Sequence, residues 1–255
     1  MRTIDTIYMD GAFVTPHGDD RAPLFNPATE KQIGEVRLGD ADDVDLAVAA
    51  AKRAFPAMAR STPAERASML RRLHKAVAAR ADDMVAAMME EYGAPSGFTG
   101  FSVQHAAALF EDMAKTVETY AFRRTIGRAE VSMEPLGVVG AIIPWNSTLG
   151  FIASKVATAI AAGSTIVVKP SEMSALQTQV MAEAVHAAGL PKGVINIVNG
   201  YGHVVGAALS THPDIAKVSF TGSTVTGRAI LTAAAVASTA HVLTVGSVNV
   251  IAHRS

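Results

Sequence analysis

Two short polar clusters hold the residue types in this sequence that are best suited to chemistry. The first, Ile142-Ile143-Pro144-Trp145-Asn146, offers an amide donor and a flat apolar ring with one N–H. The second, Lys169-Pro170-Ser171-Glu172, offers a cation and a carboxylate three residues apart. A cation and a carboxylate held together suit the two hydroxyls of a ribose. Taken alone, each cluster is equally well explained as an ordinary turn with solvated charges.

The sequence around both clusters predicts the elements that must position them. Each cluster follows an apolar run typical of a buried parallel strand, at residues 136–143 and 165–168. Each precedes a helical pattern, at residues 149–162 and 175–188. Strand, turn and helix in repetition form the βαβ unit. Ligands of open α/β sheets lie outside the carboxyl ends of such strands, so both clusters are predicted to lie at a ligand site.

Apolar strands alternate with helical segments over the second half of the chain, and this pattern predicts the fold class. We expect an α/β, Rossmann-like fold with a mostly parallel five-stranded sheet and helices on both faces. The predicted strands are residues 138–143, 165–168, 194–198, 217–220 and 242–251.

The first 133 residues predict short strands, helices and a hairpin. Strands are expected at residues 4–9, 12–14 and 33–36. Asp40 is a good N-cap for a helix that runs to about residue 55. Thr62, Pro63 and Glu65 form a capping box with proline at the first helical position of the next helix. A glycine-rich break is expected at 93–100, a further helix at 104–120 and a hairpin within 121–133.

Two glycine-bearing segments follow later strands. The segment from Gly200 to Gly206 resembles a dinucleotide fingerprint that is one residue too long, and its glycines could serve only tight turning. The segment from Gly222 to Gly227 has the glycine spacing of a phosphate loop. Arg228 stands where a nucleotide triphosphatase needs lysine, so that class is excluded. Ser223 either caps the following helix or binds a phosphate at its positive end, and both roles are compatible.

Composition narrows the function classes further. The chain has 255 residues, a formal net charge of −1 and no cysteine, which excludes thiol nucleophiles, disulfides and thiolate metal sites within it. The sequence has no long basic run of the kind that binds nucleic acid, and no two of its histidines have a metal-ligand spacing. No apolar stretch reaches the ~20 residues of a membrane span. We therefore expect a soluble cytoplasmic protein with no metal, nucleic-acid or membrane partner.

With Phe220-Thr221-Gly222-Ser223, the two polar clusters resemble the NAD(P)-dependent aldehyde dehydrogenases. The similarity runs from Asn26-Pro27-Ala28-Thr29, through Glu91-Tyr92-Gly93-Ala94-Pro95, to Gly227. It implies the N-terminal domain fold of that family, with residues 1–120 and 138–255 as the NAD-binding domain. It also implies that residues 121–137 are strands of an oligomerisation element that pairs with a neighbouring subunit.

The resemblance implies a role for each candidate residue. Lys169 and Glu172 hold the adenosine ribose, and because the carboxylate repels a 2′-phosphate, we expect NAD to be preferred over NADP. Ser223 contacts the pyrophosphate with Trp145 nearby, and Gly202 lies beside the adenine. The full set of expected cofactor-binding residues is Ile142, Trp145, Lys169, Ser171, Glu172, Gly202, Gly222 and Ser223.

The chain departs from the family pattern at the catalytic groups. The family's oxidation of an aldehyde to a carboxylic acid needs a cysteine nucleophile and a glutamate base, with Asn146 as the oxyanion donor. The chain has no cysteine, and its last glutamate is Glu183. We therefore expect a truncated NAD-binding portion without the catalytic domain. Such a chain is inactive alone and acts on an aldehyde only if that domain is supplied.

One alternative stays open at this point. The chain could be a non-catalytic structural or regulatory subunit that pairs with intact dehydrogenase chains through residues 121–137 and a helix at 224–237. Either reading is compatible with a homo-oligomer or with pairing to full-length relatives.

Overall fold

The computed structural model describes residues 1–236, 240–245 and 248–252, and in them one eight-stranded sheet forms the centre of the molecule. Its strands are β2 (Ile7–Met9), β3 (Ala12–Val14), β8 (Val138–Ile142), β9 (Thr165–Lys169), β10 (Ile195–Ile197), β11 (Ile215–Gly222), β12 (Ala240–Val245) and β13 (Val248–Ala252). They are ordered β13-β12-β11-β8-β9-β10-β2-β3. The five strands β12, β11, β8, β9 and β10 are parallel to one another. At the two edges, β13 is antiparallel to β12, β2 is antiparallel to β10, and β3 is antiparallel to β2.

The predicted fold class and its five parallel strands are confirmed, but the sheet is wider than predicted. The single strand expected at 242–251 is instead the antiparallel pair β12 and β13. At the other edge, the N-terminal pair β2 and β3 joins the sheet through β10. An apolar run does not reveal where the chain reverses or which edge a short strand joins, so the sequence could not supply either feature.

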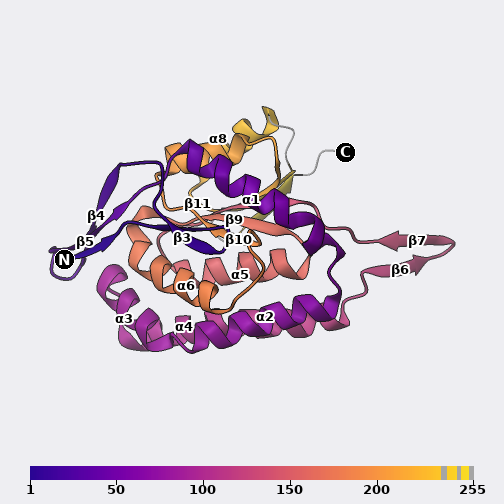
Figure 1. Cartoon of the computed structure of the whole chain (residues 1–255), viewed down its shortest axis with the longest axis horizontal. Coiled ribbons are helices and arrows are strands. Elements are labelled where there is room, and N and C mark those ends of the chain that lie inside the picture. The colour runs from indigo at the N-terminus through magenta and orange to yellow at the C-terminus, as the bar shows by residue number, and fades with distance from the viewer. Residues whose placement is uncertain (237–239, 246–247, 253–255) are drawn as a thin grey trace.

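Helices cover both faces of the sheet (Figure 1). They are α1 (Ala41–Arg60), α2 (Pro63–Ala78), α3 (Ala81–Tyr92), α4 (Ser96–Thr119), α5 (Thr148–Ala161), α6 (Ala175–Ala187), α7 (Ala207–Thr211) and α8 (Thr224–Val236). Alternate residues of β8 contribute to different cores. Val138 and Ile142 pack with α1, α7 and α8, while Val139 and Ala141 pack with α2, α4, α5 and α6. Burial on both faces explains why these strands are continuous apolar runs.

The predicted helix starts are confirmed by their capping contacts. The Asp40 side chain accepts hydrogen bonds from the amides of Asp42 and Asp43, and the Asp43 carboxylate accepts one from the Asp40 amide. At α2, the Glu65 amide donates to Thr62 Oγ1 at 3.2 Å and the Thr62 amide donates to Glu65 Oε2 at 2.7 Å. These local contacts satisfy backbone donors that a helix start otherwise leaves free.

Two predicted helix boundaries are wrong. Helix α1 continues past residue 55 through Pro56 to Arg60, where Met58 is buried. Helix α4 begins at Ser96, so Gly97 and Gly100 lie inside it rather than in a break. Glycine costs about 1 kcal/mol in a helix, and packing of the buried face of α4 outweighs that cost.

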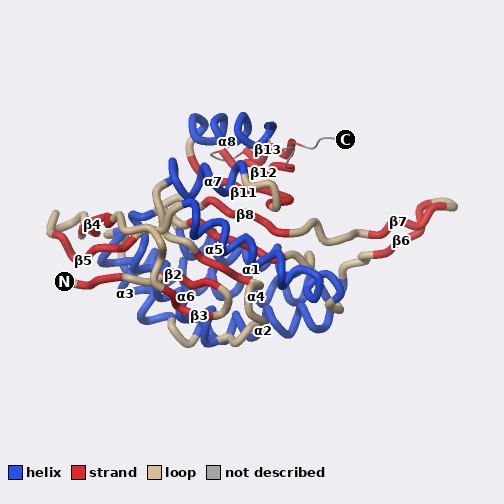
Figure 2. Tube along the Cα trace, turned by 45° about the horizontal axis from the view of Figure 1, so that its top comes forward, coloured by secondary structure: helices blue, strands red, loops and turns tan. Residues whose placement is uncertain are grey.

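The predicted hairpin is present as β6 (Arg123–Ile126) and β7 (Ala129–Ser132). Its two strands pair with each other and extend away from the body of the molecule (Figures 1 and 2). All four residues of β6 are exposed. The role of residues 121–137 in oligomerisation stays a prediction.

A separate three-stranded sheet lies at the N-terminal end of the molecule. Its strands lie in the order β1 (Arg2–Ile4), β5 (Gln32–Arg37) and β4 (Arg21–Phe25). The strand predicted at 4–9 is therefore two strands, β1 and β2, in different sheets. Strand β4 was not predicted, because Pro23 argues against a strand except at an edge, which is the place that β4 takes. In the described residues, no helix has the length and apolar character needed to cross a bilayer.

Candidate functional site

A cleft of about 570 Å³ lies at the carboxyl ends of β8, β9 and β11. Its lining includes every residue predicted for the site: Ile142, Trp145, Asn146, Lys169, Ser171, Glu172, Gly202, Gly222 and Ser223. Sheet register explains why they meet. Ile142 is aligned with Lys169 on one side and with Phe220 on the other, so the three strands end side by side.

Lys169 and Glu172 form an ion pair at the end of β9. Lys169 is 4% exposed, and its Nζ lies 3.5 Å from Glu172 Oε2. Burial lowers the pKa of Lys169, and the nearby Glu172 carboxylate partly opposes that change. Ser171 accepts a hydrogen bond from the Met173 amide, which holds the turn between them. The carboxylate stays partly exposed and is available to a hydroxyl donor.

Trp145 and Asn146 lie in the tight turn between β8 and α5. Both side chains are exposed, and the ring of Trp145 meets that of Tyr92 edge to face with centroids 5.6 Å apart. Ser147 has a φ of 53°, in the left-handed region. A non-glycine residue there costs on the order of 1 kcal/mol, and such strain is concentrated at functional sites. The turn leaves the Asn146 amide available to a ligand.

Ser223 caps α8, as one of its two predicted roles requires. The Thr226 amide donates to Ser223 Oγ at 3.2 Å, and the Gly227 amide donates to the Ser223 carbonyl at 2.9 Å. Ser223 is exposed, so the positive end of this 13-residue helix opens onto the cleft. Because an anion is stabilised at such an end, the cap and the binding role are compatible.

The two candidate glycines differ in what their surroundings require. A Cβ atom added to Gly222 would lie 2.4 Å from the ring of Phe220, so packing demands glycine there. A Cβ atom added to Gly202 would meet no described atom within 4 Å. Protein packing therefore leaves free space beside Gly202, on the wall of the cleft.

Sequence reasoning missed Lys155, which lies on α5 and lines a separate hollow. Its Nζ donates to Ser219 Oγ at 2.8 Å. Burial, together with the nearby charge of Lys217, lowers the pKa of Lys155 to about 8. The three residues share this hollow, which has a volume of about 270 Å³. The one available signal was a charged residue inside an otherwise apolar helical pattern.

Phe151 and Thr226 were also missed as cleft-lining residues.

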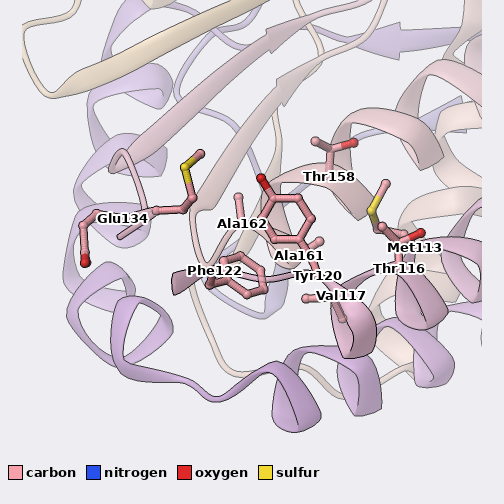
Figure 3. A pocket seen from close by; sticks show the side chains of 10 residues that line it. Met113, Thr116, Val117, Tyr120, Phe122, Glu134, Thr158, Ala161 and Ala162 are labelled. Carbon is pink, nitrogen blue, oxygen red and sulfur yellow. The ribbon is translucent and has the colours of Figure 1, made fainter. Parts of the chain in front are cut away.

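Another hollow, of about 250 Å³, lies at the root of the β6–β7 hairpin (Figure 3). The rings of Tyr120 and Phe122 meet edge to face there, with centroids 4.8 Å apart. Of its lining residues only Glu134 is charged, and no cation accompanies it. This hollow therefore lacks the groups that the cleft provides for a dinucleotide.

One group of possible metal ligands occurs in the described part of the chain: His17, Asp40 and Asp42. His17 Nδ1 lies 2.7 Å from Asp40 Oδ2, and Asp40 also caps α1. Capping and ion pairing account for these contacts without an ion. The group does not line the cleft.

Comparisons with known proteins agree with each other. A family model described as the aldehyde dehydrogenase family matches residues 13–252. A 3-succinoylsemialdehyde-pyridine dehydrogenase from Pseudomonas sp is 43% identical over 237 residues, which are 92% of this chain and 50% of that protein. A chloroplastic betaine aldehyde dehydrogenase from Beta vulgaris is 36% identical over 242 residues, which are 90% of this chain and 48% of that protein.

Solved structures show the same similarity. Aldehyde dehydrogenase C from Pseudomonas syringae, complexed with NAD+ and octanal, has a TM-score of 0.92 and 39% identity over 95% of this chain and 50% of that chain. Lactaldehyde dehydrogenase from Escherichia coli has a TM-score of 0.91 and 35% identity over 96% of this chain and 53% of that chain. The chain spans about half the length of the curated relatives that it matches.

Proposed function

The chain belongs to the aldehyde dehydrogenase family, and we propose that it is the NAD-binding portion of an NAD-dependent aldehyde dehydrogenase. The observation that carries this proposal is the convergence of Lys169, Glu172 and Ser223 on one cleft at the ends of three parallel strands. A nicotinamide dinucleotide has a ribose, a pyrophosphate and a flat adenine ring, and the cleft offers a group suited to each.

The residues present fit this cofactor. The Glu172 carboxylate accepts hydrogen bonds from ribose hydroxyls, and the Lys169 ammonium donates to them. Ser223 and the first amides of α8 suit the pyrophosphate. The free space beside Gly202 accommodates a flat ring. When bound, the cofactor supplies the hydride acceptor of the reaction, and the chain's own residues bind and orient it.

NAD is the preferred cofactor in this proposal, and NADP the weaker one. The 2′-phosphate of NADP would lie against the Glu172 carboxylate, and two like charges in contact repel each other. Lys169 offsets part of this repulsion, since its ammonium lies 3.5 Å from the same carboxylate.

The proposed substrate class of the whole enzyme is an aldehyde, with Asn146 donating its amide to the developing oxyanion. The relatives act on aldehydes as different as 3-succinoylsemialdehyde-pyridine and lactaldehyde, so their names select no single substrate. The nucleophile and base of the family reaction have no counterpart within these 255 residues, which contain no cysteine. No observation favours a non-catalytic partner subunit over this proposal.

Calorimetric titration of the purified chain with NAD tests the proposal. Gly202→Val places a side chain in the free space at the cleft wall, where its Cβ meets no described atom within 4 Å, so we expect NAD affinity to fall at least about tenfold. Gly100→Val is the matched control, because its added Cβ also meets no described atom within 4 Å and lies outside the cleft lining. Absence of NAD binding by the unmutated chain would contradict the proposal.

A further inference from the structure

The end of α3 contacts one polar cluster of the cleft and the helix that follows the other, although its residues do not line the cleft. Glu91 binds the start of α6, which follows the Lys169–Glu172 pair in the chain. Its neighbour Tyr92 packs against Trp145, with ring centroids 5.6 Å apart. Two adjacent residues of one helix therefore contact the segments that follow two neighbouring strands, β8 and β9.

Glu91 supplies the cap that α6 does not provide for itself. Ser174, at the N-cap position, accepts no capping hydrogen bond through its side chain, and its hydroxyl donates to the Ser171 carbonyl. The Glu91 carboxylate accepts instead from the Leu176 amide at 2.7 Å and the Gln177 amide at 3.1 Å. It also accepts from Gln177 Nε2 at 3.1 Å.

This contact is buried, so water cannot replace it. Glu91 is 7% exposed, Leu176 is 5% exposed and Gln177 is 1% exposed. A buried amide left without an acceptor pays the full cost of losing its contact with water. Burial raises the pKa of Glu91 to about 7, which shows how strongly the site desolvates the carboxylate. The carboxylate is retained against that cost.

Hydrogen bonds within residues 171–174 hold the turn that leads from the ribose-binding candidates into α6. The Ser174 amide and hydroxyl both donate to the Ser171 carbonyl, at 3.1 and 3.0 Å. Ser171 Oγ accepts from the Met173 amide. Glu172 lies inside this short turn, η1 (Glu172–Ser174), which leads directly into α6. A shift of the first turn of α6 therefore moves the Glu172 carboxylate.

We propose that Glu91 is a positioning residue of the cofactor site, which holds the Glu172 carboxylate in place for the ribose 2′- and 3′-hydroxyls by capping α6 from a neighbouring helix. This inference rests on the proposed NAD-binding function. It assigns to Glu91 a contribution to the choice between NAD and NADP, because that choice depends on where the Glu172 carboxylate lies.

The test is calorimetric titration of four forms of the full chain with NAD and with NADP: unmutated, Glu91→Gln, Glu172→Gln and the double variant. We expect Glu91→Gln to weaken NAD binding about fivefold, the effect of losing a cap worth about 1 kcal/mol, with little change for NADP. In the Glu172→Gln background, Glu91→Gln should have almost no further effect on NAD, because coupled residues are not additive. Glu90→Gln, a partly exposed neighbour paired with Arg2, is the matched control and should leave both affinities unchanged.

Circular dichroism and the fluorescence of Trp145, the single tryptophan, check that each variant is folded. If Glu91→Gln does not fold, Glu91→Asp replaces it, since it keeps the charge but shortens the side chain by one methylene. Equal weakening of NAD and NADP, or additive effects in the double variant, would assign Glu91 a purely structural role and overturn the inference. Unchanged NAD affinity in Glu91→Gln would overturn it as well. Failure of the unmutated chain to bind NAD would overturn the proposed function and this inference together.

Discussion

Polar residues of the cleft stabilise their own backbone turns as well as lining the cleft. Ser171 accepts from the Met173 amide, and Ser223 accepts from the Thr226 amide. A hydroxyl that accepts one backbone hydrogen bond still has a proton to donate. The same residue can therefore cap a helix and bind a phosphate. At this scale the structural and the functional interpretation of a residue do not compete.

Glu172→Gln should narrow the difference in affinity between NAD and NADP. Removing one negative charge at a partly exposed site should improve NADP binding by on the order of 1 kcal/mol. Calorimetric titration with both cofactors measures the change. Glu183→Gln is the matched control, because that carboxylate pairs with Arg80 and lies outside the cleft lining. Equal NAD and NADP affinities in the unmutated chain would count against Glu172 as the ribose ligand.

Lys155→Met should remove part of the pH dependence of stability. The folded pKa of Lys155 is about 8 and its ordinary value is 10.5, so between these values the unfolded chain binds a proton that the folded chain does not. Stability therefore rises with pH through this window and is lost as pH falls toward 8. For Lys155 the rise is on the order of 2 kcal/mol between pH 8 and 10.

Urea unfolding at pH 8 and pH 10 measures this difference. The exposed lysine Lys115 on α4 provides the control, and Lys115→Met should keep the full rise of stability with pH. Lys217 retains a share of the effect, since burial lowers its pKa too. The same pH dependence in Lys155→Met and in the unmutated chain would show that the buried ammonium of Lys155 is not the cause.

Among the elements, the β6–β7 hairpin differs most from the rest of the molecule. It is a two-stranded sheet whose outer edges pair with no other described strand, and Ile126 beside its turn is 56% exposed. An isolated hairpin is marginally stable in water, and a free strand edge is a template for pairing with another chain. The hollow at its root adds apolar surface (Figure 3).

Ile126→Glu should therefore reduce self-association of the chain. We expect the unmutated chain to elute above the mass of a monomer in size-exclusion chromatography with light scattering, and the variant to shift toward the monomer. A charge at the hairpin tip opposes burial in an interface because its desolvation is costly. Arg128→Gln, a polar change in the same turn, should leave the elution unchanged. A monodisperse monomer for the unmutated chain would refute the predicted association.

For the whole molecule, the groups for cofactor binding are present together while the groups for the family's chemistry are not. The cleft contains the residues suited to ribose and phosphate, and it contains Asn146. The 255 residues contain no thiol. A positioned amide accelerates only a reaction whose nucleophile is available, so binding and turnover should separate in this chain.

The 255-residue chain should accordingly bind NAD without oxidising aldehydes. Serine hydroxyls are weak nucleophiles unless a base activates them, so none of its serines replaces the missing thiolate. Absorbance at 340 nm with purified chain, NAD, and short aliphatic and aromatic aldehydes measures NADH formation. A heat-killed sample is the control. Turnover that survives removal of contaminating host dehydrogenases would overturn this prediction.

The sequence by itself determined the features that depend on neighbours along the chain. The N-cap at Asp40 and the capping box at Thr62 follow from contacts between residues close in the sequence. The apolar strands, each followed by a polar turn, were also evident. In a parallel sheet the ends of such strands lie at one edge, so the clusters that contain Asn146 and Glu172 could be assigned to one ligand site, and the family resemblance added Ser223.

Only the tertiary structure decided the features that join distant segments. Glu91 caps α6 across 85 residues of sequence, and Lys155 donates to Ser219 across 64. The N-terminal hairpin widens the sheet by pairing with β10. Periodicity and capping report on a residue and its near neighbours, whereas these contacts depend on which helix packs beside which. The polar residues of the two clusters in the cleft were therefore predictable, whereas Phe151, Thr226 and the contact of Glu91 with α6 were not.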